Sequence, residues 1–382
     1  MSEEKLVPKL RFSGFNDEWK SFKLNEVGNI VTGATPPTKD NDNFINSGYL
    51  WVTPGDISSK KFVSKTERNL SEKGLKNGRK LDPNSILVTC IGATIGKLCM
   101  INEIGSCNQQ LNAISANKNF YPDFIYYVIQ KTAKNLILIA GNTATPILNK
   151  KSFGNLSYIF PSFNEQKKIA LFLDKIDKKR ELLEKKYEFY QDFKKYLMQQ
   201  IFTQKLRFDF KDEWKITKLG EITKINTGNK DVKDKIDNGK YPFFVRSEKV
   251  ERINSYSFDG EAILIPGDGK IGEVYHYING KFDYHQRVYK ISDFKNNING
   301  KYIYYYLEKN FLKQALKNSA KATVDSLRMD TLTKMPIELP SFEEQVEIVD
   351  ILSLADEKIG LIEKNIKISK HFKRGLLQQM FV

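Results

Sequence analysis

The sequence predicts an α+β protein in which one fold is present twice: two mixed α/β domains joined by two long antiparallel coiled-coil helices. Three observations predict this class. Two sets of motifs recur along the chain, and each set ends in a long segment with a seam of apolar residues. The segments before these tails carry short strand-like runs between glycines and prolines, which is typical of mixed α/β domains.

The internal repeat is marked at both ends of each copy. At the start, LRF and FNDEW (10–12, 15–19) recur as LRF and FKDEW (206–208, 210–214). At the end, PSFNEQ and KKYLMQQIF (161–166, 194–202) recur as PSFEEQ and KRGLLQQMF (340–345, 373–381). We therefore expect domains over residues 1–160 and 205–339, helices over 161–204 and 340–382, and a pseudo-two-fold axis that relates the two halves.

The two tails are predicted to be helices that begin with capping boxes, Ser162 with Glu165 and Ser341 with Glu344. Ten positions of the first tail, spaced alternately by four and three residues, hold eight apolar or aromatic side chains, and ten positions 179 residues later hold eight more. This pattern indicates a coiled-coil seam. We expect the helices to pair antiparallel, with the two domains at opposite ends. The first set of seam positions is 169, 173, 176, 180, 183, 187, 190, 194, 197 and 201.

A second apolar row lies outside the seam. An apolar row of this kind needs another surface to cover it, either the globular domains or partner subunits. The alternative is that the helices are only structural spacers. The residues that we predict to bind partners are Leu182, Phe189, Tyr196, Leu361 and Ile368.

The two domains carry the basic excess of the chain, whose net charge is +15. Residues 1–160 hold 20 Lys and Arg against 13 Asp and Glu, and residues 205–340 hold 25 against 19, so 13 of the 15 net charges lie there. A basic surface beside aromatic residues favours double-stranded DNA as a partner, although any single lysine can be ordinary solvated surface.

Within the two domains, short apolar runs predict strands at Ser85–Val88 and Ala262–Ile265.

Several classes of protein are disfavoured. There is no apolar run of about 18 residues and we expect no signal peptide, so the cytoplasm is the expected location. Three Cys and three His are too few and too scattered for a disulfide framework or a metal site. Gly92–Lys97 is similar to a phosphate loop but is one residue short, and Leu98 replaces the Ser or Thr that binds magnesium. We find no methyltransferase tetrad, dinucleotide fingerprint or nucleophile, so no catalytic residue and no bound cofactor are expected.

Several stretches of the chain occur together in one known family. They are TGATP (32–36), YLWVTPGDI (49–57), GATIGK (92–97), CNQQ (107–110) and the PSFxEQ start of each tail. With these motifs the chain resembles the DNA specificity subunit of Type I restriction–modification systems. The second half departs from it, because GDGKIG (267–272) replaces GATIGK and WVTPG is absent. The resemblance implies two target recognition domains that each read one half of a split DNA sequence. It also implies spacer helices that dock two methyltransferase subunits, with restriction subunits added to the complex. S-adenosylmethionine, ATP and magnesium are then expected on the partner subunits only.

The DNA contacts are predicted to come from loops of both domains. Lys and Arg are expected on phosphates, and Gln and Arg on adenine and guanine, although each residue can instead be an ordinary loop residue. Gln110 and Gln286 have a second interpretation, as half-buried side chains that bond to strand backbone. The predicted set is Lys39, Trp51, Lys60, Lys61, Arg79, Lys97, Gln109, Gln110, Thr143 and Thr145 in the first half, and Lys230, Arg246, Lys249, Arg252, Lys270, His285, Gln286, Arg287, Lys321 and Thr323 in the second.

Two other functions remain open. A stand-alone methyltransferase or nuclease is disfavoured because no cofactor motif is present. A stand-alone DNA-binding or scaffold protein without a methylation partner is the main alternative, and as a pure scaffold it predicts no salt-dependent DNA binding.

Overall fold

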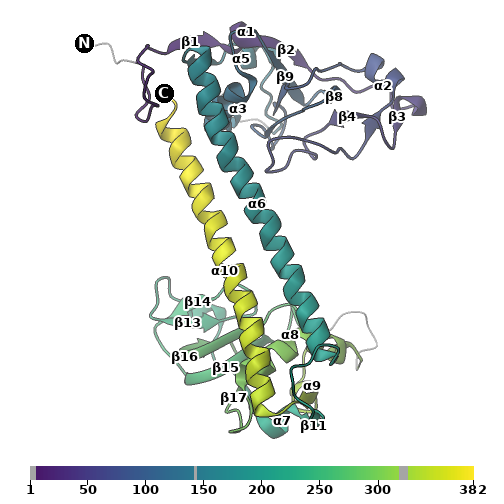
Figure 1. Ribbon diagram of the computed structural model, residues 1–382, viewed down its shortest axis with the longest axis vertical. Coiled ribbons are helices and arrows are strands. Elements are labelled where there is room, and N and C mark those ends of the chain that lie inside the picture. Colours follow the sequence, from purple (N-terminus) through teal and green to yellow (C-terminus); the bar gives the residue numbers. More distant parts are fainter. Residues whose placement is uncertain (1–5, 142–143, 318–325) are drawn as a thin grey trace. The chain divides into compact units, whose positions relative to one another are not determined.

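The computed structural model describes residues 6–141, 144–317 and 326–382. The chain forms two compact units: unit 1 is residues 1–185 and 364–382, and unit 2 is residues 186–363. Each unit holds one α/β domain and one part of each long helix, α6 (Phe163–Phe202) and α10 (Phe342–Gln379) (Figure 1). The predicted fold class is confirmed. The four domain boundaries and the placement of the domains along the helices stay predictions.

The α/β domain of unit 1 is built from three sheets. One has the antiparallel order β2 (Gly28–Thr32), β9 (Leu111–Ala116), β6 (Ile86–Thr89) and β7 (Leu98–Met100). A second has the order β3 (Phe44–Ile45), β5 (Asn69–Leu70), β4 (Tyr49–Val52) and β8 (Gly105–Cys107), with β4 and β8 parallel. The third pairs β1 (Lys20–Lys23) with β10 (Ser157–Phe160). The short helices are α1 (Leu24–Val27), α2 (Glu72–Asn77), α3 (Pro122–Thr132), α4 (Leu136–Ile139) and α5 (Lys150–Gly154).

The α/β domain of unit 2 has one sheet of six strands and one of two. The six-stranded order is β12 (Lys224–Thr227), β17 (Val288–Ser292), β15 (Phe258–Pro266), β16 (His276–Tyr284), β13 (Tyr241–Phe244) and β14 (Glu251–Ile253). The strands β11 (Lys215–Lys218) and β18 (Pro336–Leu339) form the small sheet. The helices are α7 (Leu219–Ile222), α8 (Gly300–Lys317) and α9 (Met329–Thr333).

The two domains share one topology, as the repeat predicts. The order β2-β9-β6 of unit 1 corresponds to β12-β17-β15 of unit 2, and the parallel pair β4 and β8 corresponds to β13 and β16. The main difference is that β16 is one strand of nine residues, whereas the same stretch of unit 1 is divided into β7 and β8. This division splits the sheet of unit 1 into two.

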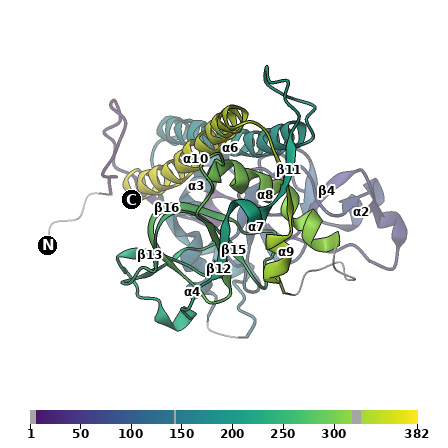
Figure 2. The ribbon, with the colours of Figure 1, turned by 90° about the horizontal axis from the view of Figure 1, so that it is seen from below.

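Each domain shares its core with the long helices. In unit 1, Phe124 and Tyr127 of α3 lie in one buried cluster with Ile86 of β6, Leu173 of α6 and Leu376 of α10. In unit 2 the corresponding helix is α8, which lies between the sheet and α10 (Figure 2). Burying these side chains removes a large apolar area from water. The long helices are therefore part of both hydrophobic cores.

The motifs that mark the repeat bind each other. The Arg11 guanidinium donates to both carboxylate oxygens of Glu165 at 2.8 Å, and Arg207 donates to both oxygens of Glu344 at 3.1 and 2.8 Å. Trp214 Nε1 also donates to Glu344 at 3.2 Å. The glutamate half of the predicted capping boxes is therefore wrong, because these carboxylates are buried against arginines far away in the sequence. The serine half is present in α10, where the Glu344 N–H donates to Ser341 Oγ.

The glutamine of each PSFxEQ motif ties α6 or α10 to its domain. Gln166 accepts the Tyr121 N–H at 2.9 Å and donates to the Pro161 carbonyl at 2.9 Å. Gln345 accepts the Asn299 N–H at 2.9 Å and donates to the Pro340 carbonyl at 3.2 Å. Both glutamines are buried, so these bonds satisfy polar groups that water does not reach.

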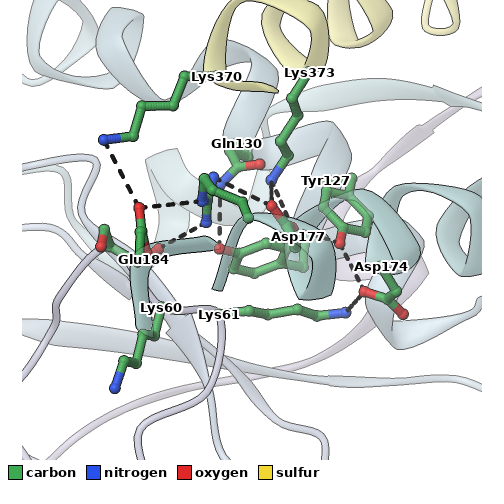
Figure 3. A network of polar contacts seen from close by, with 12 residues as sticks. Lys60, Lys61, Tyr127, Gln130, Asp174, Asp177, Glu184, Lys370 and Lys373 are labelled. Carbon is green, nitrogen blue, oxygen red and sulfur yellow. Dashed lines mark hydrogen bonds and ion pairs between the residues drawn. The ribbon is translucent and has the colours of Figure 1, made fainter. Parts of the chain in front are cut away.

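The predicted seam is confirmed, since each of its twenty positions is buried or half-buried. Two of these positions hold lysines. In unit 1, Lys373 donates to both oxygens of Asp177 at 2.8 and 2.7 Å, and the Tyr127 hydroxyl donates to the same carboxylate at 2.8 Å (Figure 3). Burial lowers the pKa of Lys373 even though Asp177 opposes this effect.

Unit 2 repeats this contact with the equivalent residues. Lys194 Nζ lies 2.8 Å from Asp356, and the Tyr305 hydroxyl donates to that carboxylate at 2.7 Å. Lys194 also donates to Glu308 at 3.0 Å. Asp356 and Lys373 stand 179 residues after Asp177 and Lys194, so one contact is built twice.

Other features of the chain bear on the excluded classes. Among the residues that the structure describes, no helix is both long and apolar enough to cross a membrane. Cys90, Cys99 and Cys107 are free and buried, and burial raises the pKa of Cys90 to about 11. In the same described part of the chain, no three His, Cys, Asp or Glu side chains gather as a metal site would need.

We predict that Lys373→Met destabilises the protein by about 3–5 kcal/mol, because it leaves the buried Asp177 carboxylate without its main cation. Urea unfolding measures this. The matched control is Lys370→Met, since Lys370 is exposed and pairs with Glu184 at 3.8 Å; we expect a change within about 0.5 kcal/mol. Equal effects of the two substitutions would contradict the assigned role of Lys373.

Candidate nucleic-acid interface

Each α/β domain carries a tight turn after a strand of its central sheets. In unit 1 the turn is Asn108–Gln110, after β8, and in unit 2 it is His285–Arg287, after β16. Asn108 Oδ1 accepts the Gln110 N–H at 3.1 Å, and His285 Nδ1 accepts the Arg287 N–H at 3.0 Å. The two turns therefore have the same backbone geometry and differ in their side chains.

Two further loops lie against each turn. In unit 1 the Cys90 N–H donates to the Gln110 carbonyl at 2.8 Å, and in unit 2 the Gly267 N–H donates to the Arg287 carbonyl at 2.8 Å. In unit 1 the loop that follows β2 also contacts the turn, because the Thr35 hydroxyl donates to Gln109 Oε1 at 2.5 Å. We name these groups loop cluster 1 (residues 33–35, 90–97 and 108–110) and loop cluster 2 (residues 228–231, 267–272 and 285–287).

A glycine makes this close packing possible in each cluster. A Cβ atom at Gly33 would lie 2.1 Å from the Asn108 carbonyl oxygen, and one at Gly228 would lie 2.0 Å from the Tyr284 carbonyl oxygen. No side chain fits at these distances. These two glycines also match in the sequence repeat, so the same contact holds both turns.

Loop cluster 1 presents Gln109 and Lys97 to solvent. Lys97 Nζ lies 3.5 Å from the Pro54 carbonyl oxygen, a weak contact that leaves the ammonium accessible. Gln110 is half-buried, as its second interpretation expects, but its side chain accepts a hydrogen bond from Asn108 Nδ2 at 3.0 Å instead of bonding to strand backbone. Trp51 is buried and donates to the Ala34 carbonyl at 3.1 Å, so its indole supports the cluster from beneath.

Loop cluster 2 brings together more charged groups. Arg246, which follows β13, and Arg287 of the turn both bind Asp268. Burial alone would raise the pKa of Asp268, but the hydrogen bonds from Arg287 and Arg246 outweigh it and lower this pKa. Gln286 is exposed, and its Nε2 donates to Asp231 at 3.2 Å. The backbone of the turn is held by Lys230, whose carbonyl accepts the Gln286 N–H.

His285 lies beneath the turn and is almost fully buried. Since its Nδ1 accepts the Arg287 N–H, its proton is assigned to Nε2, which faces Asp231 at 3.9 Å. Burial, followed by the nearby Arg246, lowers the pKa of His285 below its ordinary value. The imidazole is therefore a neutral support of the turn, and it does not face solvent as a DNA contact would.

Lys61 also differs from a DNA contact in its placement. It is only 4% exposed, and its ammonium binds Asp123. The same ammonium lies 2.5 Å from Asp174 (Figure 3). Nearby, Arg180 of α6 donates to the Ser59 carbonyl at 3.3 Å. These contacts tie the segment that ends at Lys61 to the helix, so Lys61 is withdrawn from the DNA-contact set.

The remaining predicted residues fall into three groups. Lys39, Lys60, Arg79, Thr145 and Lys270 are exposed on loops. Arg252 donates to the Gly239 and Lys240 carbonyls at 2.8 and 2.7 Å, and Lys249 binds Glu251 at 3.0 Å, so both are engaged within unit 2. Thr143, Lys321 and Thr323 lie outside the described residues.

The second apolar row of the long helices is exposed. Leu182, Phe189, Tyr196, Leu361 and Ile368 each expose between 55% and 63% of their surface. The sequence reasoning missed further exposed apolar residues of the same helices, among them Phe193, Leu354 and Phe372. Leu354 lies seven residues before Leu361 and Phe193 lies four after Phe189, so helical spacing was the signal that locates them.

A model of the Type I restriction modification DNA specificity domain matches residues 16–202 and again residues 211–369. The chain belongs to this family. It is 32% identical to the EcoDI specificity subunit of Escherichia coli over 169 residues, which is 43% of this chain and 37% of that subunit. It is 26% identical to the MjaIX specificity subunit of Methanocaldococcus jannaschii, over 65% of this chain and 62% of that subunit. These matches thus span less than two thirds of either relative.

The fold of the chain is similar to that of a solved S subunit of a Type I restriction–modification system from M. genitalium. The TM-score is 0.69 at 17% sequence identity, and the match covers 99% of both chains. At this identity the similarity supports the fold alone. The two specificity domains share a strand order, and their loop clusters carry different side chains.

The His285 geometry of the second specificity domain gives a pH-dependent stability. The pKa of His285 is lower in the folded protein than in the unfolded chain, so the unfolded chain binds more protons as pH falls. The contribution of neutral His285 to the free energy of unfolding is therefore complete above the ordinary histidine pKa. It is lost as pH falls toward the lowered pKa of the folded protein. We predict that urea midpoints fall between about pH 7.5 and about pH 5.5, and that His285→Asn falls less. Asn is a suitable replacement because Asn108 makes the same bond in unit 1. An unchanged pH slope in the variant would count against this assignment.

Proposed function

We propose that this chain is the DNA sequence-recognition subunit of a Type I restriction–modification complex and that it has no catalytic activity of its own. Each specificity domain reads one half of a bipartite target on double-stranded DNA. The observation that carries the proposal is the loop cluster: one backbone arrangement is built twice, with Asn-Gln-Gln in unit 1 and His-Gln-Arg in unit 2. Equal scaffolds with unequal exposed side chains are what two readers of different sequences need.

The residue types in the clusters fit direct readout. Gln109, Gln286 and Arg287 are exposed, and amide and guanidinium side chains form paired hydrogen bonds with adenine and guanine. Exposed lysines such as Lys39, Lys60 and Lys97 are placed to bind phosphates, which sets the register of each domain on the duplex. The concentration of net positive charge in the two domains supports the same assignment.

The chemistry of the complex then belongs to partner subunits. Methyltransferase subunits supply S-adenosylmethionine and methylate adenine N6, and restriction subunits supply ATP- and magnesium-dependent cleavage. We propose that the exposed apolar row of α6 and α10 docks two methyltransferase subunits, because such surface is unfavourable in water unless a partner covers it. The expected cytoplasmic location follows from this role.

Exchanging residues 20–160 for the same segment of a relative tests the reading role. We expect one half of the target to change and the other half to stay the same. Genome-wide mapping of methylated adenines, in cells that also express the methyltransferase subunit, measures both halves at once. A change in both halves would contradict the assignment of one reader to each domain. A target that does not change at all would favour the scaffold alternative.

The docking role is tested with Phe189→Glu and Leu361→Glu. We expect each substitution to weaken binding of the methyltransferase subunit by roughly 10–100-fold, because a charge replaces an apolar contact in the interface. The matched control is Lys195→Glu, which changes an exposed position about 120° away around α6 from Phe189. Co-purification and titration of the two subunits measure the effect. Loss of binding in the control alone would place the docking surface elsewhere.

A further inference from the structure

Loop cluster 2 contains a carboxylate that holds two arginines at once. Arg246 Nη1 lies 3.1 and 3.2 Å from the two oxygens of Asp268, and Arg287 Nη1 lies 2.8 Å from Oδ2. The three residues come from three different segments: the ends of β13 and β15, and the turn after β16. The fold therefore assembles this group, which we name the Arg–Asp–Arg group.

The carboxylate of the group is more buried than its two guanidinium groups. The Asp268 side chain is 17% exposed, whereas those of Arg246 and Arg287 are 45% and 64% exposed. The anion thus lies inward and the two cations lie outward. Asp268 also cancels one of the two positive charges, so the group acts less as a general phosphate site and more as an oriented hydrogen-bond donor.

The bonds to Asp268 leave a suitable edge of each guanidinium open. In the described part of the chain, the side-chain hydrogen bonds of both arginines use Nη1. The edge formed by Nε and Nη2 is the pair of donors that can contact two acceptors on one base. Guanine presents two acceptors, N7 and O6, in the major groove, whereas adenine presents a donor in place of O6.

Unit 1 lacks this arrangement at the equivalent positions. The Cys90 N–H donates to the Gln110 carbonyl, and the Gly267 N–H donates to the Arg287 carbonyl, so Cys90 corresponds to Gly267. The next residue is Ile91 in unit 1 and Asp268 in unit 2. Each of these two residues forms an isolated antiparallel bridge, which agrees with this alignment. The Arg–Asp–Arg group is therefore a property of the second specificity domain, in the part of the fold where the two domains differ.

We propose that Arg287 reads a guanine in the half-site bound by unit 2 and that Asp268 is the positioning residue that orients it. Arg246 completes the group by binding the other side of the same carboxylate. This inference rests on the proposed function and adds the base that one residue recognises. An arginine already held in place loses less conformational entropy on binding, so Asp268 contributes selectivity without touching the DNA.

The test uses the full chain in complex with its methyltransferase subunit, after its target has been mapped. Binding is measured on duplexes that carry each base pair, or 7-deazaguanine, at every position of the unit 2 half-site. We expect one position where guanine is preferred and where 7-deazaguanine, which lacks the N7 acceptor, weakens binding. Arg287→Ala is expected to reduce that preference by about 10–100-fold while the unit 1 half-site is unchanged.

Asp268→Asn tests the positioning role, because it keeps the size of the side chain and removes its charge. We expect a loss of about 10-fold in the guanine preference, with partial recovery in Asp268→Glu. Asp259→Asn is the matched control, since Asp259 is an exposed carboxylate of β15 outside the group. Urea unfolding of each variant separates this loss from misfolding.

The outcomes separate the inference from the function on which it rests. A unit 2 half-site without guanine, or a uniform loss of affinity for all sequences in Arg287→Ala, would overturn the inference and leave the reading role intact. Full guanine preference in a folded Asp268→Asn variant would overturn the role of Asp268. A wild-type complex with no sequence preference in either half-site would overturn the proposed function itself.

Discussion

The contact of a buried lysine with an aspartate and a tyrosine is the constraint on which the rest of the structure depends. Lys373, Asp177 and Tyr127 make it in unit 1, and Lys194, Asp356 and Tyr305 make it in unit 2. An apolar seam alone tolerates sliding by one heptad, but a buried cation must meet its anion. The lysine and the aspartate therefore fix the register of α6 and α10 in each unit. The tyrosine belongs to α3 or α8, so the same contact also fixes the domain on its helices.

The loop clusters use this rigid base. Backbone hydrogen bonds and one close-packed glycine hold each turn in the same way, whereas the exposed side chains differ between the two domains. Binding residues placed on loops of a rigid scaffold can be exchanged without cost to the core. Under the proposed function, this separation lets one fold serve as two readers. Asp231 and Asp268 lie beside the turn of unit 2, where Asp231 binds Gln286 and Asp268 binds Arg246 and Arg287.

The fold was predictable to the extent that it depends on periodic patterns and on repetition. The seam positions, the long helices and the strands expected at Ser85–Val88 and Ala262–Ile265 follow from local spacing. The structure has strands at Ile86–Thr89 and Phe258–Pro266, so the first is shifted by one residue and the second is longer than expected. The site was predictable only in part. Gln109, Gln286 and Arg287 stand in motifs that the repeat singles out. Asp268 was missed, because nothing in its local sequence distinguishes a carboxylate that binds two arginines from one that binds water.

The sequence by itself determined the twofold repeat, the length of the helices, the seam and the basic excess of the domains, because each of these is a property of neighbouring or regularly spaced residues. Only the tertiary structure decided which charges are buried and what they bind. Glu165 is typical of a capping box but binds Arg11, and Lys61 is typical of a basic loop but binds Asp123 and Asp174. The physical reason is that the environment of a charge is set by groups that the fold brings from distant parts of the chain.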